Sequence, residues 1–332
     1  MTSEFDFSTL QPDLILDALA QQGLDVSSGL LPLNSYENRV YQFSAYRDGA
    51  RRPEKFVVKF YRPQRWTELQ LREEHSFAEE LVAADIPMVA PLTFAGESLL
   101  NFAGYHYALF PSRGGRTLEI DNDEHLAQLG RFLGRLHQVG RIAPFSHRPA
   151  FSIESHLLQS RDTLLSLPLL PDYLKAAFST ALDQVIALCV QQYKPAKLIR
   201  LHGDCHAGNL FYNEQGPFFV DLDDCRSGPA IQDLWMMLSG DRQQQRDTLE
   251  LMLEEYEQYC DFDPAELKLI EPLRAMRMVH YMAWLARRWQ DPAFPLNFPW
   301  FATDKYWEQQ CLALKEQLYL LQQPALSLVP DY

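Results

Sequence analysis

One polar stretch constrains this chain more than any other feature: Leu201-His-Gly-Asp-Cys-His-Ala-Gly-Asn-Leu210, followed closely by Gly216-Pro-Phe-Phe-Val-Asp-Leu-Asp-Asp224. The pattern predicts a strand, a loop, a second strand, a turn and a third strand. Asp204 and Asn209 would then share one loop, and Asp221 would lie at the end of the hairpin that follows. Two carboxylates and one amide are therefore expected at the ends of short, neighbouring strands.

This set of side chains suits phosphoryl transfer. That reaction needs a group to orient the attacking hydroxyl and accept its proton, oxygen ligands for Mg²⁺, and a cation on the phosphates. Asp204 suits the first role, and Asn209 with Asp221 suits the second. We therefore predict an ATP- and Mg²⁺-dependent phosphotransferase, with Asp204 and Asp221 as catalytic residues and with Asn209 and Asp221 as metal ligands.

The required cation is expected to be Lys59, which lies in the strand-like segment Val57-Val-Lys-Phe60. A lysine in that position needs a counter-charge, and the predicted helix that follows offers Glu73 and Glu74. Adjacent helical residues point about 100° apart, so only one of the two glutamates can serve. We favour Glu74 as the partner of Lys59.

The remaining pattern predicts two lobes, which is also what a length of 332 residues favours. Before Pro111-Ser-Arg-Gly-Gly115 it predicts a β-rich lobe with helices at 12–22 and 67–84 and strands within 28–61, near 99 and at 105–110. Beyond that break it predicts helices at 123–139, 171–192, 246–259, 264–289 and 303–321, with one β insertion at 196–221. The expected architecture is α+β, with a nucleotide-binding lobe at 1–111 and a catalytic and substrate-binding lobe at 112–332.

Composition limits the partners and the compartment. A formal net charge of −14 argues against nucleic acid as a partner, because binding to its phosphate backbone needs a basic face. The first residues lack the basic and then apolar pattern of a secretory signal, and no apolar run approaches the length of a membrane span. Five scattered cysteines indicate reduced thiols. We expect a cytoplasmic protein, favour a monomer, and consider Cys205 redox-sensitive only if its thiol pKa is low.

The pattern His202-Gly-Asp204-x-His206-x-x-Asn209, followed by Val220-Asp221, resembles the choline kinase and aminoglycoside phosphotransferase superfamily. That resemblance implies a protein-kinase-like, two-lobed fold. It also places the family's catalytic base on Asp204, its metal ligands on Asn209 and Asp221, and its phosphate-binding lysine on Lys59.

A closer resemblance covers almost the whole chain. Three further segments are similar to bacterial stress response kinases: Leu33-Asn-Ser-Tyr-Glu-Asn-Arg-Val-Tyr41, Phe60-Tyr-Arg-Pro63 and Trp289-x-Asp-Pro-Ala-Phe-Pro295. This resemblance implies a cytoplasmic serine/threonine protein kinase that uses ATP and Mg²⁺ in a stress response. Its implied partner is a protein substrate with a serine or threonine acceptor.

Two features depart from eukaryotic protein kinases. No Gly-x-Gly-x-x-Gly is present, and in the corresponding turn, Asn34 to Asn38, we predict that Ser35 contacts phosphate. Only eleven residues separate Asp221 from Asp233, which leaves no room for a long activation loop. A small-molecule hydroxyl kinase of the choline or aminoglycoside phosphotransferase type therefore remains the alternative. The break at Phe110 to Arg113 is expected to offer backbone groups to adenine.

Two other functions fit the residues less well. A metallohydrolase built on the loop around Asp204 would leave Lys59 and Asn209 without a role. A pseudokinase that binds nucleotide without turnover is disfavoured, because every expected catalytic side chain is present.

Several neighbouring residues are given supporting roles. His202 and His206 are expected to position the loop around Asp204, and Asp233 is expected to cap a helix or brace that loop. Asp223 and Asp224 could assist metal binding, but a surface turn is favoured. A last set shares one helical face, for which a buried face with extended arginines is favoured over a substrate-binding wall: Arg277, Tyr281, Trp284 and Arg288.

Overall fold

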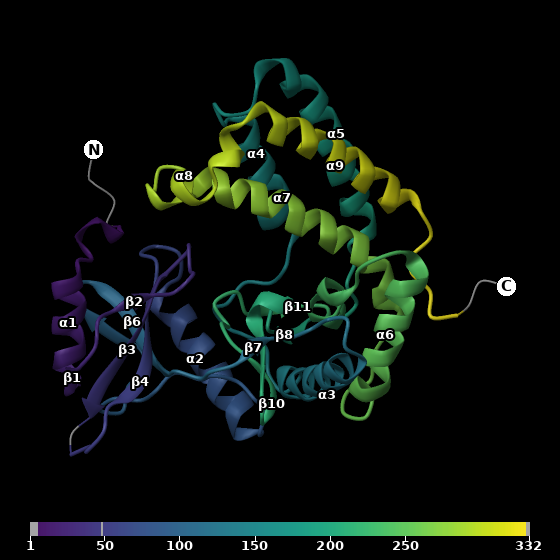
Figure 1. Ribbon diagram of the computed structural model, residues 1–332. Coiled ribbons are helices and arrows are strands. Elements are labelled where there is room, and N and C mark those ends of the chain that lie inside the picture. Colours follow the sequence, from purple (N-terminus) through teal and green to yellow (C-terminus); the bar gives the residue numbers. More distant parts are fainter. Residues whose placement is uncertain (1–5, 48, 330–332) are drawn as a thin grey trace. The chain divides into compact units, whose positions relative to one another are not determined.

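The computed structural model describes residues 6–47 and 49–329, which form two compact units (Figure 1). The first unit holds the chain up to Glu119 together with Phe145–Arg148 and Ala207–Cys225. The second unit holds Ile120–Pro144, Pro149–His206 and the chain from Arg226 onward. The lobe boundary expected between residues 111 and 112 stays a prediction.

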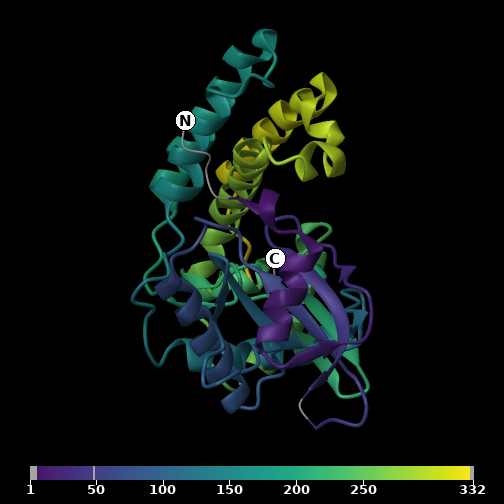
Figure 2. The same ribbon diagram turned by 90° about the vertical axis from the view of Figure 1, so that its left-hand side faces the viewer.

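The first unit is built on an antiparallel sheet with strand order β1-β3-β4-β6-β5, in which β2 also pairs with β3. The strands are β1 (Leu24–Val26), β2 (Leu31–Pro32), β3 (Arg39–Arg47), β4 (Glu54–Phe60), β5 (Leu100–Phe102) and β6 (Tyr105–Pro111). Helix α1 (Pro12–Gln21) crosses one face of this sheet (Figure 2), where Ile15 and Leu19 share a buried core with Phe56, Phe60 and Tyr107. The burial of these apolar side chains stabilises the sheet.

Helix α2 (Glu68–Ala83) follows β4 and begins at a reciprocal cap. The Thr67 hydroxyl accepts from the Gln70 amide while the Gln70 side chain accepts from the Thr67 amide. The buried face of the helix contains Leu71, Phe77 and Leu81. The same face buries Glu74, a charged group that needs a partner.

The segment Ala207–Cys225 adds a small sheet to the first unit. Strands β9 (Leu210–Asn213) and β10 (Gly216–Phe219) form the expected hairpin, and β7 (Arg116–Thr117) extends it. The 3-10 helix η3 (Ala207–Asn209) precedes the hairpin. Phe219 bridges to Met88, and its amide donates to the Pro87 carbonyl at 2.8 Å, so the hairpin is tied to the N-terminal part of its unit.

The second unit is mainly helical. Its α-helices are α3 (Asp123–Gly140), α4 (Gln159–Leu165), α5 (Asp172–Gln192), α6 (Arg242–Tyr256), α7 (Ile270–Arg288), α8 (Ala293–Asn297) and α9 (Asp304–Gln322). The helices α3 and α6 pack together, as do α5 with α9 and α4 with α7 (Figure 1). Close packing of α3 on α6 requires glycine, because a β-carbon at Gly130 would lie 2.1 Å from the Met252 carbonyl oxygen. A two-stranded ribbon of β8 (Ile199–Leu201) and β11 (Arg226–Gly228) completes the unit.

The structure corrects three details of the sequence-based prediction. Helix α6 begins at Arg242 rather than 246, because Asp241 and Gln244 form a capping box. The helix expected at 264–289 is divided into the 3-10 helix η6 (Pro264–Leu269) and α7, since Pro272 has no amide to continue an α-helix backwards. A π-helical turn, η2 (Glu154–Leu158), leads into α4 and was not predicted.

The remaining short helices are the 3-10 turns η1 (Phe7–Thr9), η4 (Ala230–Asp233), η5 (Trp235–Met237) and η7 (Pro299–Ala302).

One helix of the described residues, α5, is long and apolar enough to cross a membrane by length and composition. A core helix of a soluble protein passes the same test, so this is weak evidence for a membrane span. The apolar face of α5, which includes Phe178, Leu182 and Val185, is buried within its own unit.

Candidate active site

Lys59 lies among three carboxylates of the first unit. It sits near the end of β4, paired with Val40 of β3 on one side and Ala108 of β6 on the other. Its Nζ atom is 2.9 Å from Asp221 Oδ1, 3.3 Å from Asp223 Oδ1 and 3.4 Å from Glu74 Oε1. Burial lowers the pKa of Lys59, but the three carboxylates outweigh it and raise the pKa well above its ordinary value. Lys59 is therefore a fixed positive charge.

The structure pairs Lys59 with Glu74, not with Glu73. The two glutamates point in different directions from α2, as expected for adjacent helical residues. The Glu73 carboxylate instead accepts from three successive backbone amides, at 2.5, 2.8 and 2.7 Å: Ser146, His147 and Arg148. Glu73 thus fixes the segment Phe145–Arg148, whereas Glu74 holds the lysine.

Arg148 is a second, unpredicted partner of Glu74. Its side chain is fully buried, and Nη2 lies 2.5 Å from Glu74 Oε2. Nε donates to the Gln70 carbonyl at 2.8 Å and Nη1 to the Asp223 carbonyl at 2.7 Å. The guanidinium also stacks over Trp66, 4.3 Å from the ring centroid. One side chain thereby joins α2 to the loop that follows Asp221.

That loop begins with Asp221 in the left-handed backbone region, at φ 62°. Asp and Asn tolerate this conformation better than most residues. The Asp221 side chain is 47% exposed, and its Oδ1 atom accepts from the Asp223 amide at 3.3 Å as well as from Lys59. Asp221 is consequently held on one side by its own unit and open to solvent on the other.

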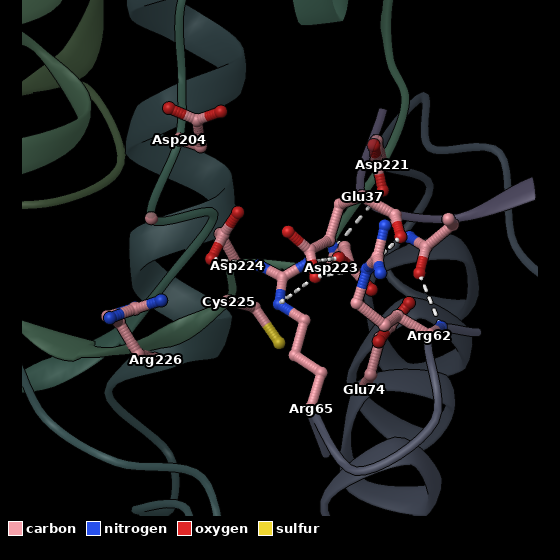
Figure 3. A network of polar contacts seen from close by, with 12 residues as sticks. Glu37, Arg62, Arg65, Glu74, Asp204, Asp221, Asp223, Asp224, Cys225 and Arg226 are labelled. Atoms are coloured by element: carbon pink, nitrogen blue, oxygen red, sulfur yellow. Dashed lines mark hydrogen bonds and ion pairs between the residues drawn. The ribbon is translucent and has the colours of Figure 1, made fainter. Parts of the chain in front are cut away.

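The expectation that Asp223 and Asp224 form a surface turn is wrong for Asp223, which is buried. Arg65 binds both aspartates, reaching Asp223 through Nη1 and Asp224 through Nη2, the latter at 2.8 Å (Figure 3). Burial raises the pKa of Asp223, but Arg65 and Lys59 outweigh it and hold the pKa below its ordinary value. These cations come from distant sequence positions, so the local pattern could not reveal them.

The turn that contains Ser35 is fixed by arginines from the loop after β4. The Arg62 Nε atom lies 3.0 Å from Glu37 Oε1 and donates to the Glu37 carbonyl at 2.8 Å. The Asn38 side chain accepts from the Arg62 amide at 3.0 Å. The Arg65 Nε atom lies 3.9 Å from Glu37 Oε1, and Figure 3 shows both residues. Ser35 itself is half-buried, and its contact with phosphate stays a prediction.

Asn209 and Asp221 come close together within the first unit. The Asn209 carbonyl accepts from the Val220 amide at 3.1 Å, immediately before Asp221. An amide and a half-exposed carboxylate offer the hard oxygen donors that Mg²⁺ prefers, so these residues fit that ion. The described residues contain no group of three or more His, Cys, Asp or Glu side chains arranged to hold a metal.

Asp204 belongs to the second unit, where its carboxylate forms an ion pair with an arginine. Arg277 of α7 places Nη1 2.5 Å from Asp204 Oδ1, and His206 places Nε2 3.3 Å from Oδ2. The prediction of a buried helix face is wrong for Tyr281, whose side chain is exposed, whereas an exposed Arg277 agrees with the extended arginines expected there. Their helical spacing was visible in the sequence, but the partner of Arg277 was not.

The backbone of the loop around Asp204 is braced by Asp233. The Asp233 carboxylate accepts from the amides of His202 and Gly203, at 2.8 and 2.9 Å. It also lies 3.1 Å from His137 Nε2, and His137 Nδ1 lies 2.8 Å from the Tyr256 hydroxyl. Of the two roles considered for Asp233, the brace is confirmed, and the side chain of His137 was missed.

Cys205, the residue after Asp204, is buried. Burial, with Asp233 and Asp204 nearby, raises the pKa of its thiol well above the ordinary value. Since the thiolate is the reactive form, this cysteine is poorly suited to redox sensing.

Residues 29–270 match the phosphotransferase enzyme family. Stress response kinase A of Escherichia coli (strain K12) is 53% identical over 331 residues, which cover 99% of each chain. Serine/threonine protein kinase RdoA of Salmonella typhimurium (strain LT2) is 53% identical over 329 residues, covering 99% of this chain and 98% of that protein.

A solved structure of amicoumacin kinase hAmiN, in complex with AMP-PNP, Ca²⁺ and Ami, superposes with a TM-score of 0.70 at 18% identity. The match covers 93% of each chain. The protein-kinase-like α+β fold expected from the sequence is thus confirmed.

Proposed function

Because this chain belongs to the phosphotransferase enzyme family and is an ATP-dependent kinase, we propose that it phosphorylates serine and threonine hydroxyls of proteins. The name of the 53% identical Salmonella relative, a serine/threonine protein kinase, supports a protein acceptor. The observation that carries the chemistry is the contact of Lys59 with Asp221 and Glu74. This contact brings Lys59, the cation proposed to bind phosphate, next to Asp221, the carboxylate proposed to bind Mg²⁺.

The proposed reaction is a direct transfer with Asp204 as the base. The acceptor hydroxyl oxygen attacks the γ-phosphorus of ATP and forms a new O–P bond. The bond between the γ-phosphorus and the β–γ bridging oxygen breaks, and ADP leaves with that electron pair. The hydroxyl proton passes to the Asp204 carboxylate. The Asp233 brace holds the backbone before Asp204, which fixes the direction of that carboxylate.

The remaining assignments concern nucleotide binding. Lys59 would bind the non-transferred phosphates, with Glu74 and Arg148 keeping its position. Asn209 and Asp221 would hold Mg²⁺, which when bound neutralises charge on the phosphate oxygens. Ser35 would contact phosphate from its turn, and the backbone near Phe110 would contact adenine.

The biological setting is also proposed from the relatives. The Escherichia coli and Salmonella relatives are both named as kinases, and the Escherichia coli protein is named for a stress response. We therefore assign this chain to a stress response. We further propose a cytoplasmic monomer that uses neither nucleic acid nor membrane as a partner. The net charge of −14 supports the exclusion of nucleic acid.

A second candidate is a kinase of small hydroxyl compounds. It is favoured by the short segment between Asp221 and Asp233, about half of which lies in β11 and η4. The amicoumacin kinase structure, which shares the fold, is of an enzyme bound to a small molecule.

The test is transfer of labelled γ-phosphate from Mg·ATP to generic protein acceptors and, separately, to small hydroxyl compounds. Wild type is compared with Asp204→Ala, for which we expect turnover lowered roughly 10²–10⁴-fold with ATP binding retained. Phosphoserine or phosphothreonine formed only by wild type supports the protein kinase. Label found only in a small compound favours the second candidate, and full turnover by Asp204→Ala overturns the role of that residue.

A further inference from the structure

Both oxygen atoms of the proposed base have a basic neighbour. Arg277 lies 2.5 Å from Asp204 Oδ1, and His206 lies 3.3 Å from Oδ2. An acceptor hydroxyl must come within about 2.6–3.2 Å of one carboxylate oxygen to give up its proton. The acceptor therefore has to share or displace one of these contacts, and Arg277 holds the closer one.

Arg277 is free to change partner more readily than the buried arginines of this protein. Its side chain is 43% exposed, and an ion pair at that exposure contributes little to stability. The acidic residue within α7 is Glu271, which pairs with Arg274 at 3.3 Å and accepts from Gln317 at 2.9 Å. A guanidinium that leaves Asp204 thus has no carboxylate of its own helix positioned to receive it.

The surface beyond Arg277 continues with aromatic side chains. Tyr281, one turn along α7, is exposed and stacks on Trp284 with ring centroids 5.6 Å apart. A cation followed by two aromatic rings suits an extended peptide better than a cationic ligand, because the arginine repels positive charge. The positive charge of Arg277 is thus a local feature of a chain whose formal net charge is −14.

We propose that Arg277 determines substrate specificity by selecting acceptors that carry a carboxylate beside the hydroxyl. When the hydroxyl binds Asp204 Oδ1, the guanidinium moves to an aspartate or glutamate next to the acceptor serine or threonine. Arginine and carboxylate fit each other through two parallel hydrogen bonds, so an acceptor with an acidic neighbour should bind more tightly than one without it. The inference rests on the proposed function and narrows its substrate to acidic protein segments.

The experiment uses the full-length protein and three peptides that differ only in charge. Each has one serine flanked by aspartate, asparagine or lysine, and kcat and KM are measured with Mg·ATP. Wild type is expected to prefer the aspartate peptide over the lysine peptide by roughly tenfold or more in kcat/KM, mainly through KM. Arg277→Gln should remove that preference, Arg277→Glu should reverse it, and Arg277→Lys should keep part of it.

Arg287→Gln provides the matched control, because Arg287 is an exposed arginine of the same helix on a different face. It should retain the wild-type preference. Since Arg277 is exposed, its variants should fold, which circular dichroism can verify. The inference is overturned if wild type and Arg277→Gln share one charge preference while both phosphorylate peptides. If wild type phosphorylates no peptide but transfers phosphate to a small compound, both the inference and the protein-kinase proposal fail.

Discussion

Arg148 binds Glu74 at 2.5 Å in a setting where neither side chain is more than 5% exposed. The contact joins α2 to the segment Phe145–Arg148, and the same arginine donates to the Asp223 carbonyl. Glu74 is thereby fixed from two sides, by Arg148 and by Lys59. Contacts within the first unit therefore fix the position of the Lys59 ammonium.

Removing Arg148 should strongly destabilise the protein. Arg148→Met leaves Glu74 buried with Lys59 as its remaining cation, and breaking a buried pair from one side costs about 3–5 kcal/mol. Arg72 lies in the same helix, α2, and forms exposed ion pairs with Glu68 and Glu97. Arg72→Met should therefore lower the free energy of unfolding by less than about 1 kcal/mol. Urea unfolding gives both free energies, and equal values would contradict the buried-network interpretation.

Lys59 should matter for catalysis far more than a neighbouring lysine on its strand. Lys59→Met removes the cation assigned to phosphate, so we expect kcat/KM for ATP to fall roughly 10²–10³-fold. Lys55→Met changes an exposed residue four positions earlier in β4 and should leave kcat/KM nearly unchanged. Steady-state kinetics on folded samples decide, and a similar loss in both variants would count against the assignment of Lys59.

Asp221 should make nucleotide binding depend on Mg²⁺. Asp221→Asn keeps a residue that tolerates the left-handed backbone at φ 62° and removes only the charge. We expect wild type to bind ATP more tightly with Mg²⁺ than without, and Asp221→Asn to show no such gain. Asp224→Asn removes the charge of a partly exposed partner of Arg65 and should still bind ATP more tightly with Mg²⁺ than without it. Calorimetric titration with and without Mg²⁺ measures this, and a full Mg²⁺ response in Asp221→Asn would refute the metal role.

Stability should fall in mild acid because of His75. Burial, with Lys59 and Arg148 nearby, lowers the pKa of His75 to about 3, and its ring contacts Tyr61 at 2.7 Å. Between about pH 6.5 and 3 the unfolded chain then binds a proton that the folded protein does not. The free energy of unfolding should therefore drop by about 1.4 kcal/mol per pH unit as the pH falls through this range.

The His75 contribution can be isolated by comparing two variants. His75→Gln should flatten the pH dependence of the unfolding free energy between about pH 6 and 4. His147→Gln alters an exposed histidine of the same unit and should keep the wild-type slope. An unchanged slope in His75→Gln would show that other groups cause the acid sensitivity.

The sequence predicted those parts of the site whose spacing is local. The hairpin that leads to Asp221 forms as expected, because a two-residue turn joins two short strands that are rich in apolar and aromatic residues. The prediction that Glu74, not Glu73, pairs with Lys59 also agrees with the structure. Adjacent helical residues point about 100° apart, so only one of the two can face the strand that carries Lys59. These relationships depend on backbone geometry over a few residues, which the pattern of residue types records.

The arginines were not predictable in the same way. Arg65, Arg148 and Arg277 each bind an acidic residue more than seventy positions away in the chain. A charged residue in a loop or on a helix looks like a solvated residue until its partner is known. Asp223 was misjudged for that reason, because its burial depends on Arg65 and Lys59.

The first unit is discontinuous, since it needs Phe145–Arg148 and Ala207–Cys225 as well as the N-terminal segment. During synthesis, the first 119 residues emerge with Lys59 and Glu74 present but without Arg148, Asp221 or Asp223. Lys59 and Glu74 then have each other but lack the further charges that surround them, and incompletely paired buried charges are costly, so we expect the final arrangement of this region to form later. We therefore expect the first unit to be completed only after residue 225 has emerged, when two of the three segments of the second unit have been made.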